Sequence, residues 1–150
     1  MGMYTEFYFR ANITDQPKTQ PAPIVDWLDE NINQDKWFEQ PFDDHEFFTL
    51  PRWSAIFMGG GAVYQESRPA VFRRKAPPGG EPYRHQLVIA SSLKDYGSET
   101  EAFIDWITPH LDMHVGDFLG YSLYEDCCDD SDEYREHPHL FFYGRESVRA

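Results

Sequence analysis

The 150-residue sequence is poor in basic residues and in cysteine, and it contains no long apolar run. Thirteen Lys and Arg stand against 26 Asp and Glu, which gives a formal charge of -13. Nucleic-acid binding through the phosphate backbone needs clustered Lys and Arg, and this sequence has few of either. We therefore expect no direct contact with nucleic acid.

Only two cysteines are present, Cys127 and Cys128, and they are adjacent. Adjacent cysteines form only a strained disulfide, so the chain has no disulfide framework of the kind found in small secreted proteins. No apolar stretch approaches the 18 residues of a membrane-spanning helix, and the first residues lack the pattern of a signal peptide. These absences predict a cytoplasmic protein that does not contact a membrane.

In several stretches of the sequence, apolar residues recur at regular positions, and this periodicity predicts the strands. Residues 3–13 alternate between apolar and polar over eleven positions, which is typical of a half-buried strand. Residues 86–93 are almost continuously apolar and predict a central strand. Further strands are expected at 115–125 and 137–143.

Two helices are predicted from apolar residues at helical spacing. The first covers about 22–33, with prolines at its front edge, where amide groups lack partners anyway. The second follows a capping box formed by Ser98 and Glu101, and Pro109 kinks or ends it.

The middle of the chain is less periodic. Residues 52–56 favour a turn of helix or an irregular segment, followed by short strands at about 56–58 and 62–66. Residues 68–84 hold five basic residues against one acid and are rich in Pro and Gly, which predicts a flexible hairpin, a long loop or an insertion.

The order of these elements indicates one α+β domain over residues 1–150. Strands with inserted helices that end in a hairpin suggest an antiparallel-dominated sheet of about five to six strands, with two helices packed on one face. A chain of this length is large enough to bury one core.

The densest group of ionisable residues is YEDCCDDSDEY, at the predicted tip of a hairpin between two strands. Calcium loops need a glycine that is missing here, and adjacent cysteines do not suit tetrahedral ligation, so no metal site is predicted. The run is either a solvated turn that keeps a hairpin edge from pairing or a negatively charged docking surface. The candidate binding residues are Glu125, Asp126, Asp129, Asp130, Asp132 and Glu133, with Tyr124 and Tyr134 as aromatic anchors.

No sequence pattern identifies a catalytic residue or a cofactor. The glycines at 59–61 and 79–80 are not followed by a phosphate-binding pattern, and no Ser or Cys lies in a nucleophile elbow. His110 and His114 lack the Glu that a metalloprotease helix requires, and His139 lacks the Ser or Thr pattern of twin-histidine phosphoesterases. The sequence therefore favours a non-enzymatic protein without a cofactor.

Charge is unevenly distributed along the chain. Residues 1–67 carry 11 acids and 4 bases, residues 68–94 carry 1 acid and 6 bases, and residues 95–150 carry 14 acids and 3 bases. Such an asymmetry steers association with a basic partner. A solvated surface without any binding function shows the same distribution of charge.

Four stretches carry a resemblance to a known group of proteins: GMYTEF at 2–7, HEFF with RW at 45–53, LKDY with EAFIDWI at 93–107, and GDFLGY with YE at 116–125. On these residues the chain resembles small uncharacterised accessory proteins of bacteriophages and prophages, with residues 68–84 as an insertion. The resemblance implies a phage accessory gene product without implying a particular chemistry.

The hypothesis is an acidic, non-enzymatic interaction protein that acts in the cytoplasm of a host cell. Its expected partner is a host or phage protein with a basic surface, such as the nucleic-acid-binding surface of a defence protein. Two alternatives stay open. One is a small-ligand-binding or catalytic domain lined by Trp53, Tyr64, His85 and Tyr121, and the other is a virion or assembly protein that forms a homo-oligomer through exposed aromatic strands.

Overall fold

A computed structural model describes residues 4–14, 23–34, 36–60, 68–75, 79, 84–124 and 138–149. Within these ranges, six strands form one sheet in the order β2-β3-β1-β4-β5-β6, and every neighbouring pair is antiparallel. The strands are β1 (Thr5–Ile13), β2 (Ala70–Lys75), β3 (Arg84–Leu93), β4 (Phe118–Tyr124), β5 (His139–Phe142) and β6 (Arg145–Arg149). The helices are α1 (Pro23–Leu28), which continues as a π-helical turn at Asp29–Asn33, α2 (Ala55–Met58) and α3 (Glu99–Ile107), with 3-10 turns at Glu46–Thr49 and Thr108–His110.

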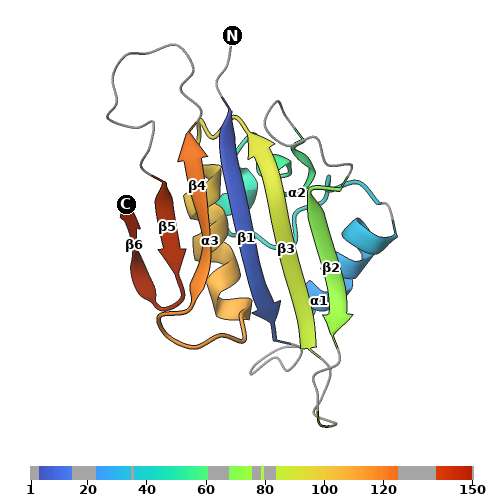
Figure 1. The fold of residues 1–150 in the computed structure, drawn as a ribbon. Coiled ribbons are helices and arrows are strands. Elements are labelled where there is room, and N and C mark those ends of the chain that lie inside the picture. Colours follow the sequence, from blue (N-terminus) through green and yellow to red (C-terminus); the bar gives the residue numbers. More distant parts are fainter. Residues whose placement is uncertain are drawn as a thin grey trace.

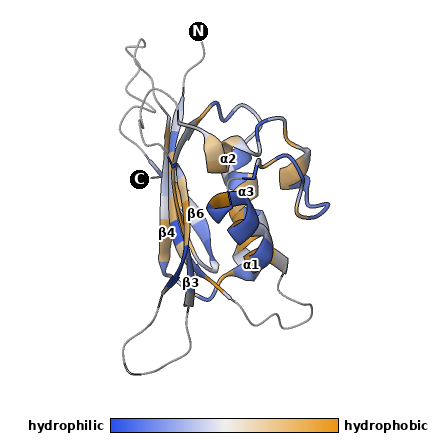
Figure 2. Ribbon diagram, turned by 90° about the vertical axis from the view of Figure 1, so that its right-hand side faces the viewer, coloured by the Kyte–Doolittle hydropathy of each residue, from blue (hydrophilic) through white to orange (hydrophobic). Residues whose placement is uncertain are grey.

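The molecule has two layers. All three α-helices lie on one face of the sheet, and the other face of the sheet points away from them (Figures 1 and 2). This arrangement confirms the predicted α+β class, the antiparallel sheet and the packing of helices on one face. None of the helices within the described ranges is both long enough and apolar enough to cross a membrane.

The core lies between β1 and α3, as the periodicity predicts. Alternate residues of β1 are buried, and Phe7 and Phe9 point toward the helices. Their rings meet Phe103 of α3 edge-on, with centroid distances of 5.6 and 5.1 Å. Such pairs add to the stability that burial alone provides, so they fix α3 across the middle of the sheet.

A cluster of aromatic rings holds the irregular segment 36–60 against this core. Its members are Trp27, Phe38, Phe42, Phe47, Phe48, Trp53, Phe57 and Trp106, which contact one another at centroid distances of 4.4 to 6.5 Å. Each large ring buries much apolar area, so packing of the rings fixes the position of the segment although it forms few regular backbone hydrogen bonds.

The short strand predicted at 56–58 is wrong, because these residues belong to helix α2. The amide of Met58 donates to the carbonyl of Ser54, and the amide of Gly59 donates to the carbonyl of Ala55, as in a helical turn. Gly59 then ends the helix where a Cβ atom would lie 2.5 Å from the carbonyl oxygen of Ser92. The strand predicted at 62–66 lies outside the described residues.

Of the alternatives predicted for residues 68–84, the long loop is wrong at Ala70–Lys75, which form the edge strand β2. This strand pairs with β3, as in the hairpin alternative, and its residues Ala70 and Phe72 are buried toward the helices. Arg73 and Arg74 are exposed, and charged residues are common on edge strands because they discourage pairing with other chains.

The predicted capping box of α3 is also wrong. Ser98 has a left-handed backbone with φ of 60° and its side chain forms no capping hydrogen bond. The cap comes from Asp95 instead, whose Oδ1 accepts the amide of Thr100 at 3.0 Å and whose Oδ2 lies 2.8 Å from the Thr100 hydroxyl. Burial raises the pKa of Asp95, while the bonds from Thr100 act in the opposite direction.

Replacing Asp95 with alanine is expected to lower the free energy of unfolding by about 1–2 kcal/mol, the usual cost of losing a helix cap. The matched control is Ser98→Ala, which we expect to cost less than about 0.5 kcal/mol because its side chain caps nothing. Urea unfolding of both variants measures the difference. Equal losses would contradict the assignment of the cap to Asp95.

Candidate acidic binding site

The structure describes only one of the eight predicted binding residues. Tyr124 ends β4 with 44% of its surface exposed. The other seven, and the two cysteines between them, lie outside the described residues. The candidate site is therefore formed by carboxylates of the described residues.

The charged residues are distributed unevenly between the helices with their connecting segments and the strands of the sheet. The helices and the segments that connect them to the sheet, residues 23–60, 68–69 and 94–117, carry four described bases, Lys36, Arg52, Arg68 and Lys94. The described acids in the same ranges are Asp26, Asp29, Glu30, Glu39, Asp43, Asp44, Glu46, Asp95, Glu99, Glu101, Asp105, Asp112 and Asp117. In contrast, the six strands carry Arg10, Arg73, Arg74, Lys75, Arg84, Arg145 and Arg149 against Glu6 and Glu146.

Part of the helix layer is a set of five exposed carboxylates that we call the acidic face: Asp43, Asp44, Glu46, Glu101 and Asp105. Three of them, Glu46, Glu101 and Asp105, line one depression of about 360 Å³. Its other lining residues are neutral: Thr49, Leu50, Gly97, Ser98 and Ala102. A depression with three carboxylates and no lining base suits a cationic group.

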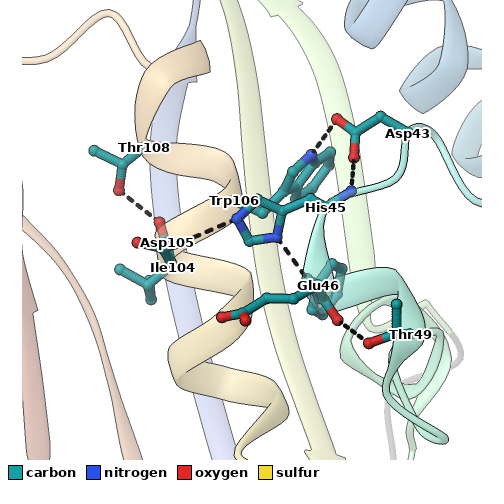
Figure 3. Close-up of polar contacts among 9 residues, drawn as sticks. Asp43, His45, Glu46, Thr49, Ile104, Asp105, Trp106 and Thr108 are labelled. Atoms are coloured by element: carbon teal, nitrogen blue, oxygen red, sulfur yellow. Dashed lines mark hydrogen bonds and ion pairs between the residues drawn. The ribbon is translucent and has the colours of Figure 1, made fainter.

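Helix α3 and the aromatic cluster position this face (Figure 3). Glu101 and Asp105 are four residues apart, which places them on the same side of α3. Asp43 is fixed by two bonds, since it accepts the amide of His45 at 2.8 Å and the indole N–H of Trp106 at 3.1 Å. The buried ring of Trp106 thus ties the loop before the 3-10 turn to the helix.

His45 forms the second link between the loop and α3. Its Nδ1 accepts the amide of Phe47 at 3.0 Å, so the proton of the neutral ring is assigned to Nε2. Nε2 then donates to Oδ2 of Asp105, also at 3.0 Å (Figure 3). The pair has the composition of a catalytic dyad, but the lone pair that a general base needs is already used by Phe47.

The nearest hydroxyl of the face does not complete a catalytic arrangement. Thr49 donates its hydroxyl proton to the carbonyl of Glu46 at 2.6 Å (Figure 3). An activated nucleophile needs a hydrogen bond to a base instead. The geometry around His45 and Asp105 therefore fits a positioned binding surface better than a reaction centre.

The remaining described histidines do not gather around a metal site. Burial lowers the pKa of His110, against the opposing charge of Asp43, and its ring packs on Phe42 and Trp106. His139 lies 2.6 Å from the hydroxyl of Ser147 and 3.5 Å from a carboxylate oxygen of Glu101. Within the part of the chain that the structure describes, no group of three His, Cys, Asp or Glu is placed to hold a metal ion.

The structure does not bring the alternative ligand site together. Trp53 lies in the aromatic cluster on the helix side, whereas Tyr121 stacks on Tyr8 on the opposite face of the sheet. His85 stacks on Phe72 at a centroid distance of 5.6 Å. Tyr64 lies outside the described residues. The three described members therefore line no common pocket.

Sequence reasoning missed the acidic face because its halves lie more than fifty residues apart. The spacing of Glu101 and Asp105 on a predicted helix and the pair Asp43-Asp44 were visible signals. Comparison with known proteins adds no further information, since no family model, curated protein or solved structure matches the chain. The interpretation of this face depends on its own geometry.

Proposed function

We propose that this protein is a non-enzymatic interaction protein that binds a basic protein surface through its acidic face. The observation that supports this best is the segregation of charge, because the helices and their connecting segments carry many acids and only four described bases. The proposed partner is a host or defence protein, and the proposed phage origin rests on the sequence resemblance alone.

The depression lined by Glu46, Glu101 and Asp105 supplies the specific part of such an interaction. An Arg or Lys side chain that enters it meets carboxylates from two elements, and ionised hydrogen bonds of this kind are about twice as strong as neutral ones. Because His45 already holds Asp105, that carboxylate loses little freedom on binding.

A basic nucleic-acid-binding surface is the most suitable target for such a face. It presents Lys and Arg at close spacing, and the acidic face offers five exposed carboxylates with which to meet them. Occupation of that surface would block the nucleic acid. The expected consequence is modulation of the partner without chemistry on it.

The test is capture of partners from host lysate with the tagged protein at low and high salt. The variant Glu46→Gln, Glu101→Gln, Asp105→Asn removes three charges but keeps an acceptor for His45. We expect it to weaken binding of the captured partner by about tenfold or more, since removal of one partner of a charge pair that binding buries costs about 2–5 kcal/mol.

The matched control removes three exposed charges elsewhere in the helix layer, through Asp26→Asn, Glu30→Gln and Glu39→Gln. It should change affinity by no more than about threefold, through the loss of long-range steering alone. Recovery of no basic partner at either salt concentration would refute the proposal. Equal losses in both variants would refute the assignment to the acidic face.

A further inference from the structure

The sheet face that points away from the helices carries a row of apolar and aromatic side chains across five strands. The strand register places these residues directly opposite one another, in the order Ala90, Tyr8, Tyr121, Leu140 and Val148. Directly paired residues point to the same side of a sheet, and neighbouring residues of one strand point to opposite sides. Because Phe7 and Phe9 point to the helices, this tyrosine row lies on the open face.

The row is accessible in the described structure. None of its five residues is buried, and Val148 is 51% exposed. The rings of Tyr8 and Tyr121 stack at its centre with a centroid distance of 5.9 Å. The described helices all lie on the other side of the sheet (Figure 2). Large contiguous apolar patches are uncommon on monomers and commonly mark interaction sites.

On β1 the charges beside the row are arranged symmetrically. On β1, Glu6 lies two residues before Tyr8 and Arg10 lies two residues after it, and all three share the open face. We propose that a second copy of this chain covers the open face, with a two-fold axis that runs along the tyrosine row.

This axis brings complementary groups together. Rotation about it reverses the direction of β1, so Glu6 of each subunit lies opposite Arg10 of the other. Each residue of the row meets its own counterpart, as an isologous interface requires. The sheets stack at about 10 Å, the usual spacing of two face-to-face sheets.

The size of the open face agrees with this arrangement. The six strands of the open face hold 41 residues, which at about 4.8 Å between strands and about 3.4 Å per residue cover roughly 670 Å² per subunit. A typical stable interface buries about 800 Å² per partner. Pairing through the sheet edges is less favourable, because β2 and β6 carry exposed arginines such as Arg73 and Arg145.

The inference is independent of the proposed function, since the acidic face lies on the opposite side of the molecule. Dimerisation through the open face leaves both acidic faces accessible. Loss of the dimer and loss of partner binding are therefore separate results.

Analytical ultracentrifugation over a concentration series tests the dimer and its axis. Arg10→Glu and Glu6→Arg, each alone, bring like charges together and should weaken dimerisation by about tenfold or more. The double variant Glu6→Arg, Arg10→Glu should restore the original dissociation constant, because the exchange recreates both pairs. Residues four apart on a strand are about 13 Å from each other, so the two side chains could pair within one subunit only if both lay fully extended across Tyr8.

The third variant, Tyr121→Glu, places a charge in the row and should give a monomer. Trp37→Glu is its control, because Trp37 is 70% exposed and lines a pocket with Phe57 and Met58 of α2 on the helix side. Circular dichroism verifies that each variant is folded. A strict monomer in the unmodified protein would overturn the inference, and so would a dimer that Arg10→Glu and Tyr121→Glu leave unchanged.

Discussion

Replacing Gly120 with alanine is expected to prevent formation of the native sheet, with a loss of more than about 4 kcal/mol. Gly120 lies in β4 opposite Phe9 of β1, at the centre of the sheet. A Cβ atom there would overlap the carbonyl oxygen of Tyr8 and lie 2.9 Å from the Cα of Phe9. Both neighbours are backbone atoms, so no change of rotamer relieves the overlap, and β1 and β4 must separate.

The control for this variant is Gly79→Ala. Gly79 has φ of 86°, and a Cβ atom added to it would meet no other atom within 4 Å, so alanine there suffers only backbone strain of about 1–2 kcal/mol. Soluble yield, circular dichroism and urea unfolding compare the two variants. A Gly120→Ala variant that is as stable as Gly79→Ala would show that the β1–β4 contact is looser than described.

Replacing Trp106 with alanine is expected to lower the free energy of unfolding by about 3–5 kcal/mol, as for other buried Trp and Phe residues. Trp106 is 2% exposed, and its ring contacts Phe47 and Phe48 at centroid distances of 5.6 and 4.9 Å. The variant removes these contacts and leaves Asp43 without its indole donor. The loop that carries half of the acidic face should loosen with it.

Two further variants separate the causes. Trp106→Phe keeps most of the packing but removes the hydrogen bond to Asp43, so a smaller loss is expected, near about 1–2 kcal/mol. Trp37→Ala removes an exposed indole and should cost less than about 0.5 kcal/mol. Urea unfolding monitored by circular dichroism compares all three. Similar losses for Trp106→Ala and Trp37→Ala would contradict the placement of Trp106 in the core.

The parts of the fold that could be predicted are those in which one face of an element is buried. The strand expected at 3–13 is β1, and that expected at 86–93 is β3, because their inward residues are apolar at every second position or throughout. The second helix is α3, with Phe103, Trp106 and Ile107 buried. Burial imposes periodicity on the sequence, so these elements can be recognised in it.

The parts that could not be predicted take their structure from neighbours. Strand β6 is exposed at all five residues, so its sequence shows no apolar alternation, and it forms because β5 offers a free edge after the turn at Gly144. Strand β2 is basic and follows a proline, a composition that favours a loop. The acidic face depends on tertiary packing between Trp106 and the loop at Asp43, which no local pattern reveals.

The distribution of charge over the two layers also has an electrical consequence. With acids on the helix side and bases on the strands, the described part of the molecule has a dipole moment that lies roughly perpendicular to the sheet. In the field of a positively charged surface, such a molecule turns its helices forward before contact, which raises the rate of productive encounter. In a dimer stacked on the open faces, the dipole moments of the two subunits point in opposite directions and cancel. Such a dimer would approach a positively charged surface without a preferred orientation.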